Sequence, residues 1–275
     1  MKKLLIAACL LVAGTTQAQV KMPAPSPTQS IKQDFALGSV EIVYSRPSAK
    51  GRKVFGDLVP YGKIWRTGAN NATVIKFTDP VLINGKKIDT GSYALYTVPG
   101  EEEWEIILNK GFTNSGLTNY KESDDVMRFK VPSKKVKMPV ENFTIQFADV
   151  KPESCTIQLI WQKTCVDIPV TAIIKDRIRT QIEKAMLTDK KPYYLAAQFY
   201  NEYDNNKTKA LEAITNAVKD SPKAYYMWLY KAKLEKEMGN KAAAKLSSQT
   251  SLALATEQKN DDYIKMNEDL LKKLK

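Results

Sequence analysis

The spacing of apolar residues changes near Thr171, and this change constrains the fold more than any other feature of the sequence. Before it, apolar and polar residues alternate in short runs, most regularly over residues 143–147 and 156–161. After it, apolar residues recur every four positions, at Ile174, Ile178, Ile182 and Met186. Alternation of period two is typical of strands with one buried face, and recurrence every four residues is typical of amphipathic helices. The sequence therefore predicts an α+β chain in which the strands precede the helices.

The strand-forming part has the pattern of an antiparallel fold. Residues 31–170 contain about nine or ten short runs separated by turn signals such as Asn84-Gly85 and Pro99-Gly100. Asn and Gly both tolerate the positive φ that a tight hairpin turn needs. Because no helix-length segment lies between the runs, a parallel sheet with helical crossovers is disfavoured. We expect an antiparallel β-sandwich domain over residues 31–170.

The helix-forming part shows a self-similarity with a period of 34 residues. Segment 205–207 recurs as 239–241, and Ala210 recurs as Ala244. Each unit has the pattern of two helices, first 193–203 with 207–219 and then 223–238 with 241–257, and residues 261–274 form a capping helix. The spacing, the turn and the small residue resemble the tetratricopeptide repeat. We expect residues 171–275 to form a tetratricopeptide-like repeat domain that holds a protein partner.

The N-terminus has the pattern of a secretory signal peptide. A basic start precedes an apolar run, residues 4–14, that is too short to span a bilayer as a helix, and Ala18 ends a cleavage site of small residues. Residues 1–18 are therefore a predicted signal peptide, and the Pro- and Ser-rich residues 19–30 are a predicted linker. We expect an exported protein of the periplasm or cell envelope without a transmembrane segment. Cys9 leaves a lipoprotein alternative open.

Composition removes several classes of chemistry. The chain has no His, which excludes His-based triads, HExxH proteases and His-ligated zinc. Its formal net charge of +12 favours anionic partners, but the lysines are spread along the chain, as on a solvated surface, and an exported protein rarely meets nucleic acid. We predict no metal site, no cofactor and no nucleic-acid partner.

Two cysteines, Cys155 and Cys165, would remain after cleavage. An oxidising compartment permits a disulfide between them. A hairpin turning near residues 162–164 would place the two thiols too far apart for a bridge. We favour two free buried thiols, and the bridged form remains an alternative.

Residues 46–71 hold the densest cluster of unusual residues, with basic and aromatic side chains interleaved. Arg offers a planar fork for carboxylate or phosphate, and aromatic rings stack on sugars. One interpretation is a site for an anionic or glycan ligand, formed by Arg46, Tyr61, Trp65, Arg66 and Asn70. The other is a long ordered loop in which Trp65 fills the edge of the core while Arg66, Asn70 and Asn71 satisfy buried backbone carbonyls.

Three segments carry a resemblance to a known family. They are PYGKIWRTGANNAT at residues 60–73, INGKKIDTGSYALYTVPGEEEWEIILNK at 83–110 and DVMRFKV at 125–131. Over roughly residues 25–170 the chain resembles the exported bacterial family called domain of unknown function 2911. The resemblance implies an export signal and a domain boundary near residue 170, and it implies no catalytic residues.

Together these patterns predict a non-enzymatic binding or scaffold protein of the bacterial cell envelope. The loop at residues 46–71 would hold the ligand, and the helical repeats would hold a protein. The alternative is a cell-envelope hydrolase that uses an Asp or Glu of the sandwich domain as its base. Two inward-facing carboxylates about 5–10 Å apart would favour the hydrolase.

Overall fold

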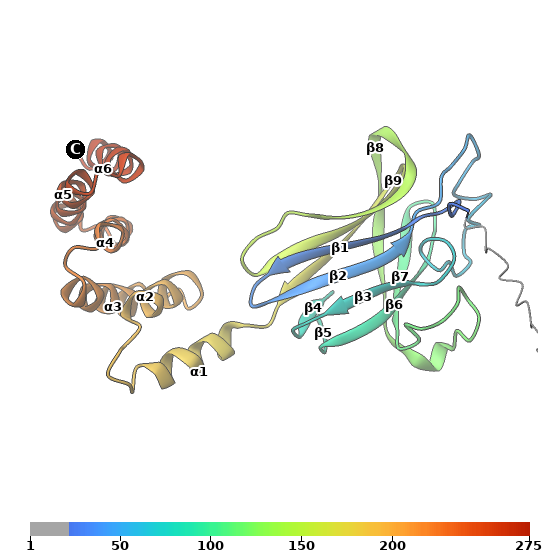
Figure 1. Ribbon diagram of the computed structural model, residues 1–275, viewed down its shortest axis with the longest axis horizontal. Helices are drawn as coiled ribbons and strands as arrows, with labels where there is room; N and C mark the ends of the chain where they lie inside the picture. Colours follow the sequence, from blue (N-terminus) through green and yellow to red (C-terminus); the bar gives the residue numbers. More distant parts are fainter. Residues whose placement is uncertain (1–21) are drawn as a thin grey trace, which may run out of the picture. The chain divides into compact units, whose positions relative to one another are not determined.

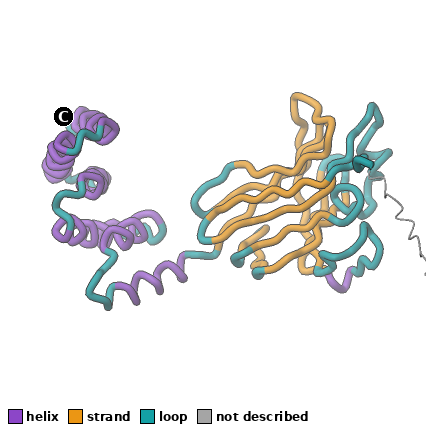
Figure 2. The backbone as a smooth tube through the Cα atoms, viewed as in Figure 1, coloured by secondary structure: helices purple, strands orange, loops and turns teal. Residues whose placement is uncertain are grey.

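The computed structural model describes residues 22–275. The predicted signal peptide, residues 1–18, lies outside the described residues. The described chain divides into two compact units, residues 22–78 with 83–170 and residues 79–82 with 171–275. The first unit is built mainly of strands and the second mainly of helices (Figure 2), which confirms the α+β prediction.

Nine strands of the described chain form one antiparallel sheet, in the order β1-β2-β3-β6-β7-β8-β9-β4-β5 (Figure 1). The turn between β4 and β5 is the predicted Asn84-Gly85, with φ of 48° and 73°. The strands are β1 (Thr28–Phe35), β2 (Gly38–Ser45), β3 (Thr73–Phe77), β4 (Val81–Ile83), β5 (Lys86–Ile88), β6 (Gly91–Val98), β7 (Glu103–Asn109), β8 (Asp125–Ala148) and β9 (Ser154–Ala172).

The first strand begins earlier than its composition suggests. β1 starts at Thr28, which pairs in register with Ser45 of β2. Gln29 accepts a hydrogen bond of 2.7 Å from the Tyr44 hydroxyl. The linker prediction is therefore wrong at residues 28–30, because pairing with β2 overrides the weak strand preference of a Ser- and Gln-rich segment.

β8 and β9 are long strands that bend, and the bend brings the sheet back over itself. The register of β8 on β9 shifts between Lys135 and Val140, which marks a β-bulge. Beyond the bulge, the Tyr44 hydroxyl of β2 accepts from the Ile145 amide at 2.9 Å, and the two rings of Tyr44 and Phe143 meet edge to face. β2 and the second half of β8 are not neighbours in the sheet, so these contacts close one core between them.

Cys155 and Cys165 both lie on β9 and are free and buried. The expected hairpin at residues 162–164 is wrong, because β9 continues through this segment from Ser154 to Ala172, and the extra residues at the register shifts belong to β8. The thiols are separated by about ten residues of one strand, beyond the reach of a disulfide. The favoured prediction of two free buried thiols is confirmed, for a different geometric reason.

These thiols should be unreactive in the folded protein. Burial raises the pKa of each thiol to about 11, so both stay protonated at pH 8. In a chain purified without residues 1–18, we expect almost no reaction with Ellman's reagent under native conditions and two thiols per chain in denaturant. Fast reaction of either thiol in the native protein, or fewer than two thiols after unfolding, would contradict this arrangement.

β6 and β7 bury both of their faces, so their sequences do not alternate cleanly. Leu95 and Ile106 are fully buried on the inner face. On the outer face, Tyr96 and Ile107 form a second buried cluster with Ala72 and Ala94, and Tyr120 packs against it. The loop at residues 110–124 supplies Tyr120 and therefore covers the outer face of the sheet.

The second unit contains six helices in the described chain. The turns at residues 205–207 and 239–241 are equivalent, since Asn206 and Asn240 each cap the following helix by accepting a backbone N–H bond. The helices are α1 (Lys175–Ala185), α2 (Tyr193–Glu202), α3 (Lys207–Asp220), α4 (Tyr225–Glu237), α5 (Lys241–Glu257) and α6 (Asp261–Lys273).

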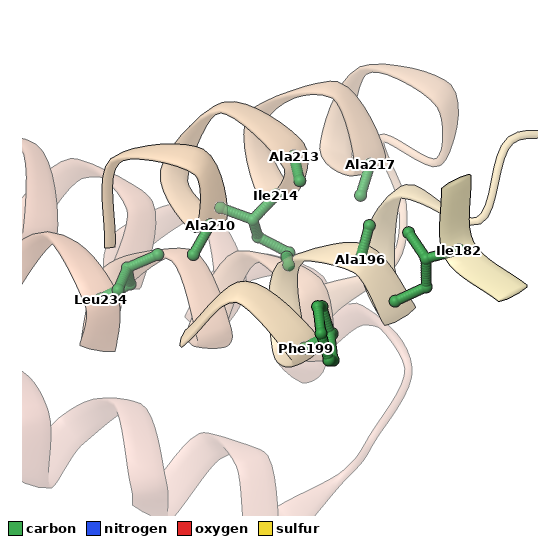
Figure 3. Packing of buried hydrophobic residues seen from close by; sticks show 9 residues of the cluster. Ile182, Ala196, Phe199, Ala210, Ala213, Ile214, Ala217 and Leu234 are labelled. Carbon is green, nitrogen blue, oxygen red and sulfur yellow. The ribbon is translucent and has the colours of Figure 1, made fainter. Parts of the chain in front are cut away.

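Small residues let the helices of this unit approach closely. Ala210 and Ala244, equivalent in the 34-residue pattern, are both fully buried. Figure 3 shows the core around α2 and α3, formed by Ile182, Ala196, Phe199, Ala210, Ala213, Ile214, Ala217 and Leu234. Among residues 22–275, none of the helices has both the length and the apolar character that a membrane-spanning helix needs.

Candidate functional site

Trp65 lies in the core of the β-sheet unit and not on its surface. Its side chain is 9% exposed, and its indole N–H donates to the Gly68 carbonyl at 3.0 Å. The ring stacks on Trp161 with centroids 5.9 Å apart. Its other aromatic neighbours are Phe55, Trp104 and Phe143. Trp65 is thus a core residue, as the ordered-loop interpretation expects, but it lies among four aromatic side chains where that interpretation placed it at the edge of the core.

The two arginines of the predicted site bind protein atoms. Arg46 donates from Nε to the Phe143 carbonyl at 3.1 Å and from Nη2 to the Thr144 hydroxyl at 2.8 Å. Arg66 donates to the Asn70 carbonyl at 3.0 Å. Both side chains are half-buried; Arg46 uses two of its guanidinium nitrogens on protein atoms, and Arg66 uses one.

Tyr61 is half-buried against the backbone of the same loop. A Cβ built on Gly56, which has a φ of 88°, would lie 2.8 Å from the Tyr61 ring. Gly56 therefore allows the ring to lie flat against the chain. The structure does not bring Tyr61 together with Asn70 around one cavity.

Asn70, unlike Trp65, is exposed and lines a groove. Its side-chain amide donates to the Ser26 carbonyl at 3.1 Å and to the Ser45 hydroxyl at 3.2 Å. Beside it lies a hollow of about 190 Å³, which we call the asparagine groove. Its lining comes from the ends of β1, β2 and β3 and two loops, and consists of Thr28, Val43, Tyr44, Ser45, Asn70, Asn71, Ala72, Val74, Phe112, Thr113 and Asn114.

The wall of the asparagine groove opposite Asn70 comes from the loop at residues 110–124. Phe112 is 45% exposed, and Thr113 is also exposed. Asn114 donates to the Tyr96 hydroxyl at 3.3 Å and accepts a backbone bond from Ala72 at its carbonyl. The loop is thus fixed at Asn114 while Phe112 and Thr113 face outward.

Gly116 allows this loop to approach the segment that holds Arg66. It has a φ of 62°, and a Cβ built there would lie 2.7 Å from the Arg66 guanidinium. The Gly116 carbonyl accepts a bond of 3.2 Å from the Tyr96 hydroxyl. A larger residue at position 116 would be strained by this positive φ and would displace the Arg66 guanidinium from its present place.

A polar network at the far end fixes the loop on β7 and β8. Asp125, whose side chain is 8% exposed, accepts bonds from Asn109, from the Tyr120 hydroxyl at 2.9 Å and from Arg128 at 2.7 Å. Arg128 also pairs with Glu105 at 3.1 Å. Burial, followed by the bond to Asp125, raises the pKa of Tyr120 to about 12. All of these groups have protein partners, so this network positions the loop.

The asparagine groove is polar but uncharged. Its lining combines three Asn, two Thr, one Ser and one Tyr with the apolar Val43, Ala72, Val74 and Phe112, and it holds no Asp, Glu, Lys or Arg. In the part of the chain that the structure describes, the Asn71 side chain makes no hydrogen bond. Amides and hydroxyls beside an exposed ring are the groups that recognise sugar hydroxyls and the apolar face of a sugar ring.

Sequence reasoning missed Phe112, Thr113 and Asn114. The segment that contains them, GFTNSG at residues 111–116, places an aromatic residue among Gly, Asn, Thr and Ser. Such a composition indicates a turn that leaves its aromatic side chain exposed. What the sequence does not reveal is that this turn lies against residues 70–72.

The structure thus defines a β-sheet protein with a small, neutral polar groove, continued by helical hairpins. A family model described as "Protein of unknown function (DUF2911)" matches residues 26–170, more than half of the 275-residue chain. The chain belongs to this family, which confirms the resemblance carried by residues 60–73 and 83–110. Comparison with curated proteins and with solved structures gave no match. Within residues 22–275, no group of three or more His, Cys, Asp or Glu side chains could hold a metal ion.

Proposed function

We propose that this protein is an exported, non-enzymatic binding protein of the bacterial cell envelope, and that its asparagine groove binds a neutral glycan. Export is supported by the sequence of residues 1–18. In this proposal residues 31–170 form the glycan-binding β-sandwich domain. Residues 171–275 form a tetratricopeptide-like domain that holds a protein partner.

The observation that carries the glycan proposal is the uncharged lining of the groove beside the exposed Phe112 ring. Of the two ligand classes that the sequence suggests, an anion would need a free cation. No cation is among the lining residues, and the guanidinium groups of Arg46 and Arg66, outside that lining, each donate to a protein oxygen. A glycan needs amide and hydroxyl partners, which Asn71, Thr113 and Asn114 supply.

The size of the groove sets the part of the ligand that it can enclose. Pockets that enclose drug-sized molecules have volumes of roughly 300–1,000 Å³. At about 190 Å³, the asparagine groove suits a single sugar residue of a longer chain. The hydrolase alternative is less favoured, because the groove lining offers no carboxylate to act as acid or base.

An array of neutral and anionic oligosaccharides tests this proposal. We expect the chain to bind a subset of the neutral members. Phe112→Ala should weaken this binding by about tenfold or more, which corresponds to about 1.4 kcal/mol. Asn114→Ala should act in the same direction, because it removes an amide beside the ring.

Leu117→Ala provides the matched control. Leu117 lies on the same loop and is 45% exposed, as Phe112 is, but it does not line the groove. We expect its binding to equal that of the wild type. Equal binding by Phe112→Ala, or binding of anionic members alone, would refute the glycan proposal. Release of shortened oligosaccharides would favour the hydrolase.

A further inference from the structure

A second hollow lies within the helical unit, between α4 and α6. Its volume is about 400 Å³, and we call it the α4–α6 groove. Its lining includes Lys233, Lys236 and Glu237 of α4. Lys236 and Glu237 lie three and four residues after Lys233, so all three side chains share one helical face. The lining thus combines successive turns of one helix with a facing helix.

The facing helix supplies an apolar floor and a further lysine. Met266 is 45% exposed, and Leu270 is 7% exposed and packs against Leu229 and Ala232 of α4. Lys273 lies one turn beyond Leu270 on the same face. Since Leu270 is fixed by the core beneath it, the floor of the groove has a defined shape.

The charges of the α4–α6 groove are unbalanced. Its two carboxylates are already paired with lysines that do not line it, Glu237 with Lys207 at 3.1 Å and Asp269 with Lys272 at 3.2 Å. Its own three lysines have no such partners. In the chain from residue 22 onward, no ion pair or side-chain hydrogen bond involves Lys233, Lys236 or Lys273. The groove therefore offers three free ammonium groups around an apolar floor.

We propose that the α4–α6 groove binds an acidic segment of the partner protein. Carboxylates of the segment pair with the three lysines, and one apolar side chain rests on Met266 and Leu270. This inference rests on the proposed role of the helical unit in holding a protein partner, and it names the chemistry of the segment that is held. Charge complementarity makes the association faster and sensitive to salt.

A fluorescein-labelled oligoglutamate peptide with one central leucine is a suitable probe, measured by fluorescence anisotropy on the full chain. We expect Lys233→Glu combined with Lys273→Glu to weaken binding by at least about tenfold. Lys241→Glu combined with Lys245→Glu makes the same change in net charge on α5, outside the groove, and should weaken binding by no more than about twofold. Met266→Ala should weaken binding of the leucine-containing peptide more than binding of plain oligoglutamate.

Several results would overturn this inference. They are absence of probe binding, equal weakening by the two double variants, and preference for a sulfated polysaccharide over the peptide. A further test separates the groove from the general role of the helical unit. If an envelope protein is recovered equally well by both double variants, the groove inference fails while the proposed partner-binding function stands.

Discussion

Replacing Trp65 by Ala should destabilise the β-sheet unit by about 3–5 kcal/mol, the range for a large aromatic residue removed from a core. The side chain contacts four aromatic residues, and its N–H is bonded to the Gly68 carbonyl. Removing it leaves a cavity between β7, β8 and β9 as well as an unbonded buried carbonyl. Urea unfolding followed by far-UV circular dichroism measures the loss directly.

Phe112→Ala is the matched comparison for this experiment. Phe112 is a large aromatic residue that is 45% exposed, so its removal should change the free energy of unfolding by no more than about 0.5 kcal/mol. Trp65→Ala would then lose oligosaccharide binding because the β-sheet unit unfolds, whereas Phe112→Ala would lose oligosaccharide binding while remaining folded. A Trp65→Ala variant within about 1 kcal/mol of the wild type would show that Trp65 is not the centre of the core.

Replacing Asp125 by Ala should cost about 2–4 kcal/mol and loosen the loop at residues 110–124. The substitution leaves Arg128, Tyr120 and Asn109 without their shared acceptor in a mostly buried position. Hydrogen exchange should show lower protection of the backbone amides at residues 112–120. Glycan binding should fall as well, because this loop forms one wall of the asparagine groove.

Asp124→Ala is the control for this substitution. Asp124 precedes Asp125 directly, but its carboxylate is not part of the network around Arg128. We expect its effect on stability to stay within about 0.5 kcal/mol and its effect on loop exchange to be negligible. If both variants behaved alike, the network would not be what holds the loop.

The elements of this fold could be predicted from sequence because their signals are local. The alternation over residues 143–147 and 156–161 lies within β8 and β9, and the Asn84-Gly85 turn joins β4 to β5. The helical pattern predicted α2 to α6, and each predicted end lies within about two residues of the end in the structure. Each of these signals is contained within a few neighbouring residues.

The bent strands and the first strand could not be predicted in this way. The sequence predicts two separate strands where the structure has the single strand β8. The middle of β8, near Met138, is exposed, so apolar and polar residues do not alternate there. β1 is defined by its pairing with β2, and its own residues have weak strand preference. Register and continuity depend on contacts between distant segments.

The candidate site illustrates the same limit. The sequence places Arg, Trp and Asn together in residues 46–71, which identifies an ordered segment but not which side chains point outward. Trp65 faces Trp161, almost a hundred residues further along the chain, whereas Asn70 faces Phe112 and Asn114. Only the tertiary arrangement separates the residue that supports the fold from the residues that line the groove.

Titration of an asparagine-labelled chain by nuclear magnetic resonance tests the central claim most directly. Isotope-labelled full chain would be titrated with the neutral oligosaccharide that the array selects, and the side-chain amide resonances would be followed. We predict shifts at Asn70, Asn71 and Asn114 and none at Asn201 or Asn267 of the helical unit. Unmoved groove amides in the presence of a bound oligosaccharide would contradict the account.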